Sequence, residues 1–558
     1  MQMTADGLLL QKLYQHESNH PGRVYMVQPL GDDKVREYSW AEVVDESRRV
    51  AQYLKSQGLE PGSSVAILSK NTAEFVMTDL AIWMAGYVSV AIYPTLAPDT
   101  IAYILEHSES KLIFIGKLDG WKNLKPGIPV DLPRIYHSLA PESGDVNWAD
   151  VVANNEPIEG RPIRDGSDIA AIVYTSGSTG KPKGVVHNFE CMSIAATGMS
   201  KAIRASDDER MLSYLPLAHV FERVAVECCS LVIGYTVFFA ESLATFNADM
   251  VRARPTVFIS VPRLWLKFQL GVFSKMPEEK LSKLLKIPIV KGLIRKKLLV
   301  GLGLDACRLA ISGSAPLPPN VIDWYRSSLG LELLEGYGMS ENFAYSHFSP
   351  PGQGRLGYVG SPLDGVEHRI SDKGEIEVKS PANMVSYFKL PEVTAESFTE
   401  DGFLLTGDRG EIDAQGRLKI TGRTKELFKT SKGKYVAPAP IENLLNTDGH
   451  IELCCVTGPA QPSPYALLQL SEDIRAAGVD EAKRDELAPL FLALLQEVNG
   501  QLDPHERLQF MVVVKDEWGI ENEFLTPTMK IKRSEIEKAY EPFVDAWYSS
   551  REKIIWES

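Results

Sequence analysis

The stretch that decides the fold is YTSGSTGKPKGVVH, residues 174–187, which places glycines, hydroxyls and lysines directly after an apolar strand pattern. A Walker A loop requires G-x-x-x-x-G-K-[ST]. Counting back from Gly180 and Lys181, the first glycine position holds Thr175, and the position after the lysine holds Pro182. Because proline cannot donate an N–H and disfavours a helix starting there, we exclude a P-loop with its lysine at a helix N-terminus.

A phosphate-binding loop of another kind remains. The backbone N–H groups and hydroxyls of such a loop can form an anion-binding nest, and Lys181 or Lys183 can then meet pyrophosphate charge. The alternative is a surface loop rich in turn-forming residues. The density of glycine, hydroxyl and lysine favours the nest, whose other members are Thr175, Ser176, Gly177, Ser178, Thr179 and Gly180.

The bulk composition is that of a soluble globular protein. The 558 residues are 44% hydrophobic and 24% charged, and a chain this long forms roughly two to four domains or subdomains. A net charge of -14 argues against a general nucleic-acid-binding surface. It leaves anionic substrates open, because one pocket can be basic on an acidic protein.

Cysteine spacing and hydropathy favour a cytoplasmic protein. The six cysteines show no zinc-binding spacing, and we expect them to be reduced core residues. The first 18 residues lack a basic region and contain only a three-leucine apolar run, so we expect no signal peptide. Residues 81–94 are apolar but too short to span a bilayer, and read as a buried helix followed by a buried strand.

The chain alternates short apolar runs with helical patterns, which predicts an α/β fold. We expect a helix after residue 70, with Asn71 near its N-cap. Several mostly apolar runs predict strands that are covered on both faces, at residues 63–69, 111–116, 170–176, 236–240 and 256–262.

The pattern changes after about residue 354 to short strands separated by Gly, Asp and Lys turns, including a turn at residues 413–417. A smaller α/β unit follows, with helices near residues 440–446 and 480–499. We therefore predict a large N-terminal domain of α/β subdomains and a small mobile C-terminal α/β domain. The predicted boundaries are 1–422, with a β-rich part at about 355–422, a hinge at 423–426, and 427–558.

The glycine-rich stretch and five ordered motifs resemble the adenylate-forming, or AMP-binding, superfamily, and within it the long-chain fatty acyl-CoA synthetases. The resemblance covers nearly the whole chain. The further motifs are SGSAPLP (312–318), EGYGMSE (335–341), TGDRGEID (406–413), GRTKELFKTSKGKYVAPAPIE (422–442) and LTPTMKIKR (525–533).

The resemblance implies ATP, Mg²⁺ and the co-substrate CoA. In EGYGMSE, Tyr337 would lie along the adenine, Ser340 would contact phosphate, and Glu341 would be a catalytic Mg²⁺ ligand, as suits a hard cation. Ser340 stands where the family usually has threonine, and its hydroxyl is kept. The remaining residues of the implied nucleotide site in these two motifs are Gly313, Ser314, Ala315, Gly336, Gly338 and Met339.

The later motifs supply the rest of the implied site. Asp408 would accept hydrogen bonds from the ribose, Arg423 would also contact the nucleotide, and Lys425 would be the hinge position. Lys530 would be the catalytic lysine that contacts both the carboxylate and the α-phosphate. We interpret Lys532 and Arg533 as an exposed basic turn.

The resemblance also bears on the acyl acceptor and the acid. Gly433 matches the position beside which the pantetheine arm of CoA passes, where glycine allows close approach; a plain turn glycine is the alternative. SYLPLAHVFERV (213–224) resembles the long-chain version of its motif and adds His219 as a catalytic residue. The small apolar residues that follow suit a tunnel wall or an ordinary buried helix.

We therefore expect a medium- to long-chain fatty acid–CoA ligase. The alternatives are an adenylating enzyme that delivers to a carrier protein or another acceptor, and a catalytically degenerate acyl-binding protein. No carrier-domain pattern follows in these 558 residues, which favours CoA. A fatty substrate leaves peripheral membrane contact open, but we identify no amphipathic helix or basic patch that requires it. Chain length and oligomeric state stay open.

Overall fold

The computed structural model describes residues 3–175, 181–526 and 529–557. The chain divides into two compact units. The first unit comprises Met1–Ala315, Val321–His368 and Val378–Leu405, and the second comprises Pro316–Asn320, Arg369–Glu377 and Thr406–Ser558. The mixed α/β architecture predicted from the sequence is confirmed within each unit.

The first unit is built around a seven-stranded sheet of order β18-β8-β7-β4-β3-β5-β6. The strands from β7 to β6 run parallel, while β8 and β18 are antiparallel to their neighbours. All five residues of β3 and of β4 are buried, as expected for strands covered on both faces. The strands are β3 (Ser64–Leu68), β4 (Val88–Ile92), β5 (Leu112–Ile115), β6 (Arg134–Tyr136), β7 (Ile169–Thr175), β8 (Lys183–Asn188) and β18 (Ser386–Tyr387).

Two further sheets complete the first unit. One has the order β2-β1-β10-β9, and the other has the order β11-β12-β13-β14-β15. Their strands are β1 (Val24–Gly31), β2 (Lys34–Ser39), β9 (Arg210–Ser213), β10 (Thr236–Phe239), β11 (Val257–Ser260), β12 (Leu309–Ser312), β13 (Leu333–Tyr337), β14 (His347–Phe348) and β15 (Ser361–Pro362).

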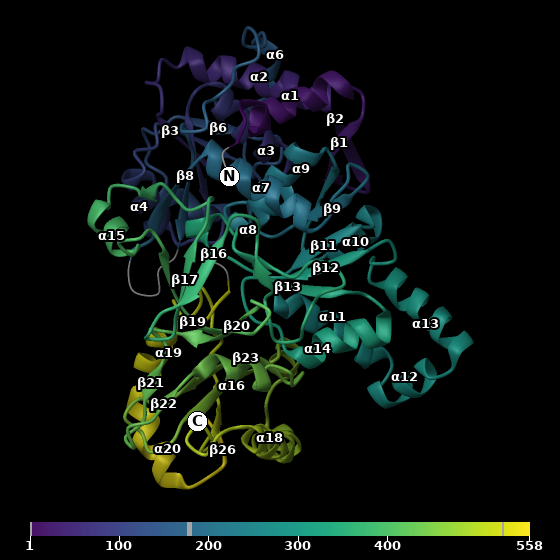
Figure 1. Cartoon of the computed structure of the whole chain (residues 1–558), viewed down its shortest axis with the longest axis vertical. Helices are drawn as coiled ribbons and strands as arrows, with labels where there is room; N and C mark the ends of the chain where they lie inside the picture. Colours follow the sequence, from purple (N-terminus) through teal and green to yellow (C-terminus); the bar gives the residue numbers. More distant parts are fainter. Residues whose placement is uncertain (1–2, 176–180, 527–528, 558) are drawn as a thin grey trace. The chain divides into compact units, whose positions relative to one another are not determined.

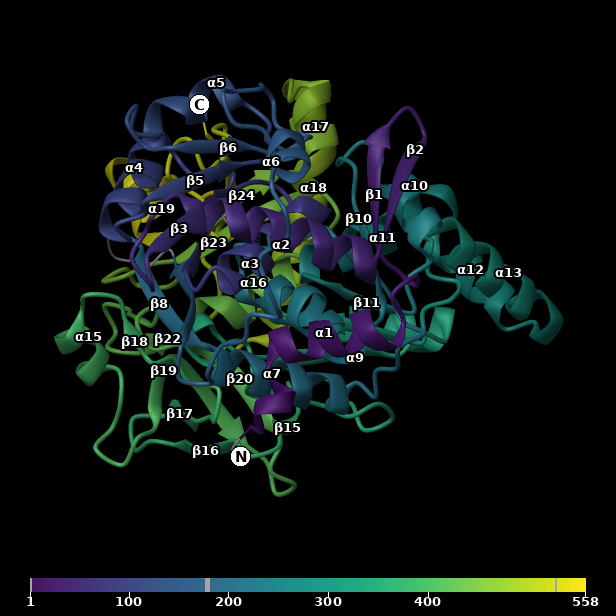
Figure 2. The same cartoon turned by 90° about the horizontal axis from the view of Figure 1, so that it is seen from above.

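Helices cover these sheets, and α3 (Ala73–Met84) is buried at every position between α2 and the strands. Its N-cap is Thr72, whose hydroxyl accepts from the Phe75 N–H, and Asn71, expected near the cap, lies directly before it. Figure 1 and Figure 2 show α12 and α13 extending away from the sheets of this unit. The other helices are α1 (Leu9–Asn19), α2 (Trp40–Ser56), α4 (Pro98–His107), α5 (Trp121–Leu124), α6 (Trp148–Asn154), α7 (Phe189–Ala202), α8 (Val220–Glu222), α9 (Cys229–Ile233), α10 (Phe246–Ala253), α11 (Pro262–Lys275), α12 (Glu278–Leu285), α13 (Pro288–Gly301), α14 (Pro319–Trp324) and α15 (Pro391–Glu396).

The second unit contains the antiparallel hairpins that the turn residues predict. Its first sheet has the order β16-β17-β19-β20, and the predicted turn at residues 413–417 joins β19 to β20. The Asp413 N–H donates to the Arg417 carbonyl at 3.0 Å, which closes that turn. The strands are β16 (Glu367–Ile370), β17 (Glu375–Lys379), β19 (Leu404–Ile412) and β20 (Leu418–Arg423), followed by the hairpin of β21 (Phe428–Lys429) and β22 (Tyr435–Val436).

A four-stranded sheet of order β23-β24-β25-β26 forms the core of the C-terminal part. Alternate residues of its strands point to opposite faces, so the adjacent Cys454 and Cys455 enter two different apolar clusters. α18 packs on the first face and α19 with α20 on the second. The elements are β23 (Ile451–Thr457), β24 (Tyr465–Leu470), β25 (Met511–Val513), β26 (Ile554–Trp556), α16 (Pro438–Leu445), α17 (Glu472–Ala477), α18 (Glu481–Gln501), α19 (Arg533–Tyr540) and α20 (Val544–Ser550).

Most of the cysteines lie in the core, as the sequence predicted, whereas Cys307 is only partly buried. All six cysteines are free thiols, and five are buried. Across residues 3–175, 181–526 and 529–557, the longest apolar helices fall short of what a membrane crossing requires.

Candidate active site

The side chain of Glu341 is held by a tyrosine that sequence reasoning did not identify. Tyr387 Oη donates to Glu341 Oε1 at 2.7 Å, and the Met384 N–H donates to the Glu341 carbonyl at 2.7 Å. The Lys183 ammonium lies 5.1 Å from the centre of the Tyr387 ring, a cation–π distance. Burial, followed by the Glu341 carboxylate, raises the pKa of Tyr387, so its hydroxyl keeps its proton. Tyr387 therefore connects two of the predicted ATP-binding segments.

The turn after β13 that carries this carboxylate has a fixed, strained backbone. The Met339 N–H donates to Asn342 Oδ1 at 2.9 Å, and the Ala344 N–H donates to the Met339 carbonyl at 2.9 Å. Phe343 and Ala344 have φ values of 48° and 59°. Residues other than glycine rarely adopt this left-handed region, and each instance costs about 1–3 kcal/mol. The surrounding hydrogen bonds thus hold the turn in one shape.

The two glycines of EGYGMSE have different structural roles. A methyl group on Gly338 would meet the Ala344 carbonyl group at 2.5 Å, whereas one on Gly336 would meet nothing closer than 3.4 Å. Close approach therefore requires glycine at position 338. Between them, the Tyr337 ring lies 5.9 Å from the ring of His347. Burial lowers the pKa of His347 to about 3, so this neighbour of the predicted adenine platform is neutral at physiological pH.

The carboxylate of Glu341 fits the Mg²⁺ that the resemblance implies. Across the described ranges, no three His, Cys, Asp or Glu side chains gather into a group that could hold a metal. Mg²⁺ is commonly bound by one or two carboxylates together with substrate phosphates. A single preset carboxylate is the donor set expected for a cation that arrives with ATP.

The SGSAPLP motif begins where β12 ends. Ser314 has φ 69°, a left-handed turn residue, and the Gly313 N–H donates to the Ser260 carbonyl at 3.1 Å. The Phe221 ring lies within 2.8 Å of where a methyl group on Gly313 would sit, so glycine lets the ring pack there. This brings SGSAPLP next to the predicted acyl motif at residues 213–224.

In that acyl motif, His219 caps α8: its Nδ1 accepts from the Phe221 N–H at 3.1 Å, and its ring lies 6.5 Å from that of Tyr93. Asn71 fixes the preceding loop, donating to the Leu215 carbonyl at 2.6 Å and accepting from the Leu217 N–H at 3.1 Å. Sequence reasoning missed this role of Asn71, because the two segments lie far apart in the chain.

Glu222 and Arg223 of the same motif are buried. Glu222 accepts from Ser213 Oγ at 2.8 Å, and burial raises its pKa to about 8. Arg223 forms a salt bridge with Asp79 and lies 3.4 Å from Glu227, with all three side chains inaccessible to solvent. These residues hold the motif in place from within the core. The run that follows is a π-helix that is buried throughout and then α9, whose first three residues are buried.

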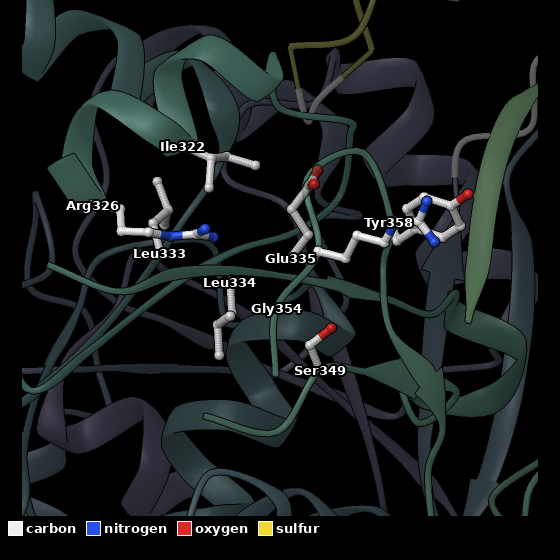
Figure 3. Close-up of a pocket in the computed structure, with 9 residues that line it drawn as sticks. Ile322, Arg326, Leu333, Leu334, Glu335, Ser349, Gly354 and Tyr358 are labelled. Carbon is white, nitrogen blue, oxygen red and sulfur yellow. The ribbon is translucent and has the colours of Figure 1, made fainter. Parts of the chain in front are cut away.

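A small hollow lies beside β13, directly before the predicted adenine-binding residues. Its volume is about 10 Å³, room for about one water molecule. Figure 3 shows Glu335 and Tyr358 on one side of it and Ile322 with Arg326 on the other. The hollow is therefore part of the packing that supports β13. Its lining residues are Ile322, Arg326, Leu333, Leu334, Glu335, Ser349, Gly354, Arg355 and Tyr358.

The glycine-rich stretch joins β7 to β8, where Thr175 and Lys183 are register partners. The Lys181 ammonium lies 4.8 Å from the centre of the Tyr103 ring. Of the predicted loop residues, Ser176, Gly177, Ser178, Thr179 and Gly180 lie outside the described part of the chain.

The second unit brings three predicted residues together. Asp408 and Arg423 are register partners on β19 and β20, and Arg423 Nε donates to Asp408 Oδ1 at 3.0 Å. Lys530 keeps a solvent-exposed surface. Nevertheless, desolvation, followed by the Arg423 charge, lowers the pKa of Lys530 to about 8, while Asp408 and Glu426 act in the opposite sense. Asp408, Arg423 and Lys530, the residues predicted to contact the ribose, the nucleotide and the carboxylate, thus lie close enough for their charges to interact.

The turn that carries Lys530 is anchored by a residue whose role was mispredicted. The Lys530 N–H donates to Thr526 Oγ1 at 3.1 Å, and α19 begins three residues later at Arg533. Arg533 is not an exposed turn residue: its side chain is 10% exposed and pairs with Glu442 at 2.7 Å and 3.0 Å. It also donates to the Val456 carbonyl at 2.6 Å. Arg533 leaves the basic turn to pair with the nearly buried carboxylate of Glu442. The sequence could not reveal this contact, because Glu442 lies 91 residues earlier in the chain.

The remaining two predicted positions are turn residues. Lys425 is exposed in a turn after β20, where the neighbouring Thr424 N–H donates to the Gly407 carbonyl at 2.8 Å. Gly433 has φ 77° in the hairpin between β21 and β22, and only the Lys429 side chain comes within 4 Å of where its methyl group would be. The left-handed φ explains the glycine, and the open space leaves this backbone accessible.

Comparison with known proteins identifies the family. The family model described as AMP-binding enzyme matches residues 13–388, and that of the AMP-binding enzyme C-terminal domain matches residues 426–552. The chain therefore belongs to the AMP-binding enzyme family, as its motifs predicted.

Named relatives of the chain are AMP-forming acid–thiol ligases. It is 30% identical to the peroxisomal long chain acyl-CoA synthetase 6 of Arabidopsis thaliana, covering 93% of this chain and 82% of that one. It is 28% identical to the long-chain-fatty-acid–CoA ligase FadD15 of Mycobacterium bovis, covering 96% of both. The fold matches the crystal structure of the anthranilate CoA ligase AuaEII in complex with anthranoyl-AMP with a TM-score of 0.80 and 21% identity, over 97% of this chain and 100% of that chain.

Proposed function

We propose that this chain is an ATP-dependent acyl-CoA synthetase that activates a medium- to long-chain fatty acid as the acyl-adenylate and then forms the CoA thioester. The observation that carries the proposal is the clustering of Lys530 with Asp408 and Arg423 in a chain of this family. The acyl class is supported by relatives named for long-chain fatty acids that align over more than nine-tenths of the chain.

In the first step, a carboxylate oxygen of the acid attacks the α-phosphorus of ATP and the bond to the bridging oxygen breaks, releasing pyrophosphate. The protonated Lys530 would orient that carboxylate and offset charge at the α-phosphorus. Glu341 would hold Mg²⁺, which supplies positive charge to the phosphates. Thr175, Lys181 and Lys183, together with the loop at 176–180, would hold the departing pyrophosphate.

In the second step, the CoA thiol attacks the acyl carbon, AMP leaves, and the thiol proton is lost to solvent. We propose that the backbone at Gly433 lies beside the pantetheine arm. We also propose domains at residues 1–422 and 427–558, with a hinge at 423–426 around Lys425 that lets the C-terminal domain present a different face in each step. In this account Lys530 serves only the first step.

The test separates the two half-reactions. Lys530→Ala should abolish acid-dependent pyrophosphate exchange, yet leave thioester formation from a supplied acyl-adenylate intact. Lys532→Ala, two residues away, is the matched control and should keep both. Equal loss of both half-reactions in a folded Lys530→Ala protein would contradict the two-face account, and unchanged exchange would show that Lys530 is not the adenylation lysine.

A second experiment addresses the acid and the acceptor. A series of saturated fatty acids with ATP, Mg²⁺ and CoA, read by AMP formation, should show its best kcat/KM at medium to long chains. AMP release that does not depend on free CoA would favour delivery to a carrier protein or another acceptor. No AMP formation with any acid would favour a degenerate binding protein.

A further inference from the structure

The helical hairpin of α12 and α13, residues 278–301, differs from the rest of the chain in its charge. It contains seven cationic side chains and two carboxylates, which gives it a net charge of +5. Since the whole chain has a net charge of -14, the residues outside the hairpin carry -19. Throughout the described residues, none of its six lysines forms a salt bridge. They are Lys280, Lys283, Lys286, Lys291, Lys296 and Lys297.

The same hairpin exposes large aliphatic side chains. α13 spans 14 residues, and not one of them is buried. Ile289 is 82% exposed, Leu293 69% and Val300 46%, with Ile287 at 49% immediately before the helix. Leu293 lies four residues after Ile289, and Val300 lies seven residues after Leu293. These spacings place the three side chains on one face of the helix, together with Lys296. The outer stripe is therefore aliphatic and cationic at once.

The opposite side of the hairpin is tied to its own unit. Arg295 donates to the carbonyls of Ser327 and Ser328 at 2.5 Å and 2.8 Å, and Leu281 of α12 is 1% exposed. Both views show the two helices extending from the rest of that unit (Figures 1 and 2). The anchoring fixes which face is turned outward, so the exposed stripe is a defined surface.

We propose that the α12–α13 hairpin docks this protein onto an anionic lipid surface. The aliphatic stripe would enter the boundary between headgroups and acyl chains, and the long lysine side chains would reach the phosphates around it. The sequence analysis identified no amphipathic helix or basic patch that requires membrane contact, and the exposure of α13 becomes visible only in the structure. The inference does not depend on the proposed enzymatic function.

The charges and side chains argue against the other occupants. A symmetric contact with a second copy would place +5 against +5, because a two-fold interface uses the same patch on both chains. A nucleic acid would have no aromatic side chain to stack on between residues 278 and 301 and would not need Ile289 or Leu293. An anionic bilayer uses both the cations and the aliphatic side chains.

Co-sedimentation of the full chain with vesicles tests the proposal. Phosphatidylcholine vesicles that contain phosphatidylglycerol should bind the protein, and pure phosphatidylcholine vesicles should bind it much more weakly. Neutralising Lys296→Gln and Lys297→Gln together should lower the partition coefficient about 25-fold, at roughly fivefold per charge. The double change Ile289→Gln and Leu293→Gln should lower it about tenfold or more.

Matched controls lie elsewhere on the surface. The pair Lys34→Gln and Lys122→Gln removes the same charge, and the pair Val130→Gln and Leu243→Gln removes aliphatic side chains that are 95% and 92% exposed. Both control proteins should bind as the unchanged protein does, and all variants should keep its thermal transition.

Three results would overturn the proposal. Equal binding to both kinds of vesicle would show that the lysines do not recognise anionic headgroups. If the control pairs lowered the partition coefficient as much as the hairpin variants do, the hairpin would not be the contact. If the protein bound soluble heparin as tightly as vesicles and the Ile289→Gln, Leu293→Gln protein bound heparin and vesicles normally, the surface would instead recognise a soluble polyanion.

Discussion

Replacing Arg533 by methionine should destabilise the second unit strongly. The guanidinium forms a fork with both carboxylate oxygens of Glu442, at 2.7 Å and 3.0 Å, and also donates to the Val456 carbonyl at 2.6 Å. The two side chains are 10% and 11% exposed. Methionine fills a similar volume but leaves the carboxylate without its counter-charge.

The magnitude follows from what the carboxylate keeps. Breaking a buried ion pair by removing one partner costs about 3–5 kcal/mol. Glu442 retains the Val456 N–H at 2.7 Å and slight exposure, so we expect the lower end, about 3 kcal/mol. For a unit of this size each kcal/mol shifts the midpoint by about 2–4 °C, so the transition should fall by roughly 6–12 °C.

Scanning calorimetry of the full chain measures the shift. Lys483→Met is the control, because its ion pair with Glu486 has side chains that are 29% and 60% exposed and such pairs contribute at most about 1 kcal/mol. The double change Glu442→Gln with Arg533→Met should cost less than the sum of the single changes. An Arg533→Met shift no larger than that of the control, or strict additivity, would refute the reasoning.

Three further predictions concern the active site. The kcat/KM of acid-dependent adenylation should fall as the pH rises through about 8, where Lys530 loses its proton, leaving about a tenth of the activity one pH unit higher; if the always-charged Lys530→Arg protein showed the same fall, another group would be responsible. Gly338→Ala should displace the turn at Ala344, which should lower the free energy of unfolding by about 1–3 kcal/mol and remove most ATP-dependent activity. Gly336→Ala should be tolerated, and thermal melts and kinetics of the two proteins compare them directly. Tyr387→Phe removes the donor to the site carboxylate and should raise the Mg²⁺ concentration needed for half-maximal activity about tenfold; an unchanged Mg²⁺ titration would mean that this hydrogen bond does not prepare the metal site.

Most strands were predictable from the sequence because an apolar run is a local property. The expected strand at residues 111–116 is β5 (Leu112–Ile115), and the expected helix and strand at residues 81–94 are the end of α3 and β4. The glycine-rich stretch and the later motifs allowed the family to be recognised, because their residue types recur at fixed spacing, and the two family models confirm that resemblance.

What escaped prediction depends on contacts between distant segments. Tyr387 meets a carboxylate 46 residues earlier, and Arg533 meets one 91 residues earlier. No local pattern distinguishes that arginine from Lys530, which lies three residues earlier and keeps an exposed surface. The exposure of α13 is likewise a property of the fold, because only the structure shows that nothing of the same unit covers Ile289 and Leu293.

The two left-handed residues after β13 have a consequence for turnover. The unfavourable backbone energy of these two residues is offset when the protein folds, because the surrounding structure holds them in place. The turn that carries Glu341 is therefore already ordered in the free protein, and the nucleotide that we propose binds there would not have to order it. The folding stability of the first unit thus fixes where the Glu341 carboxylate lies.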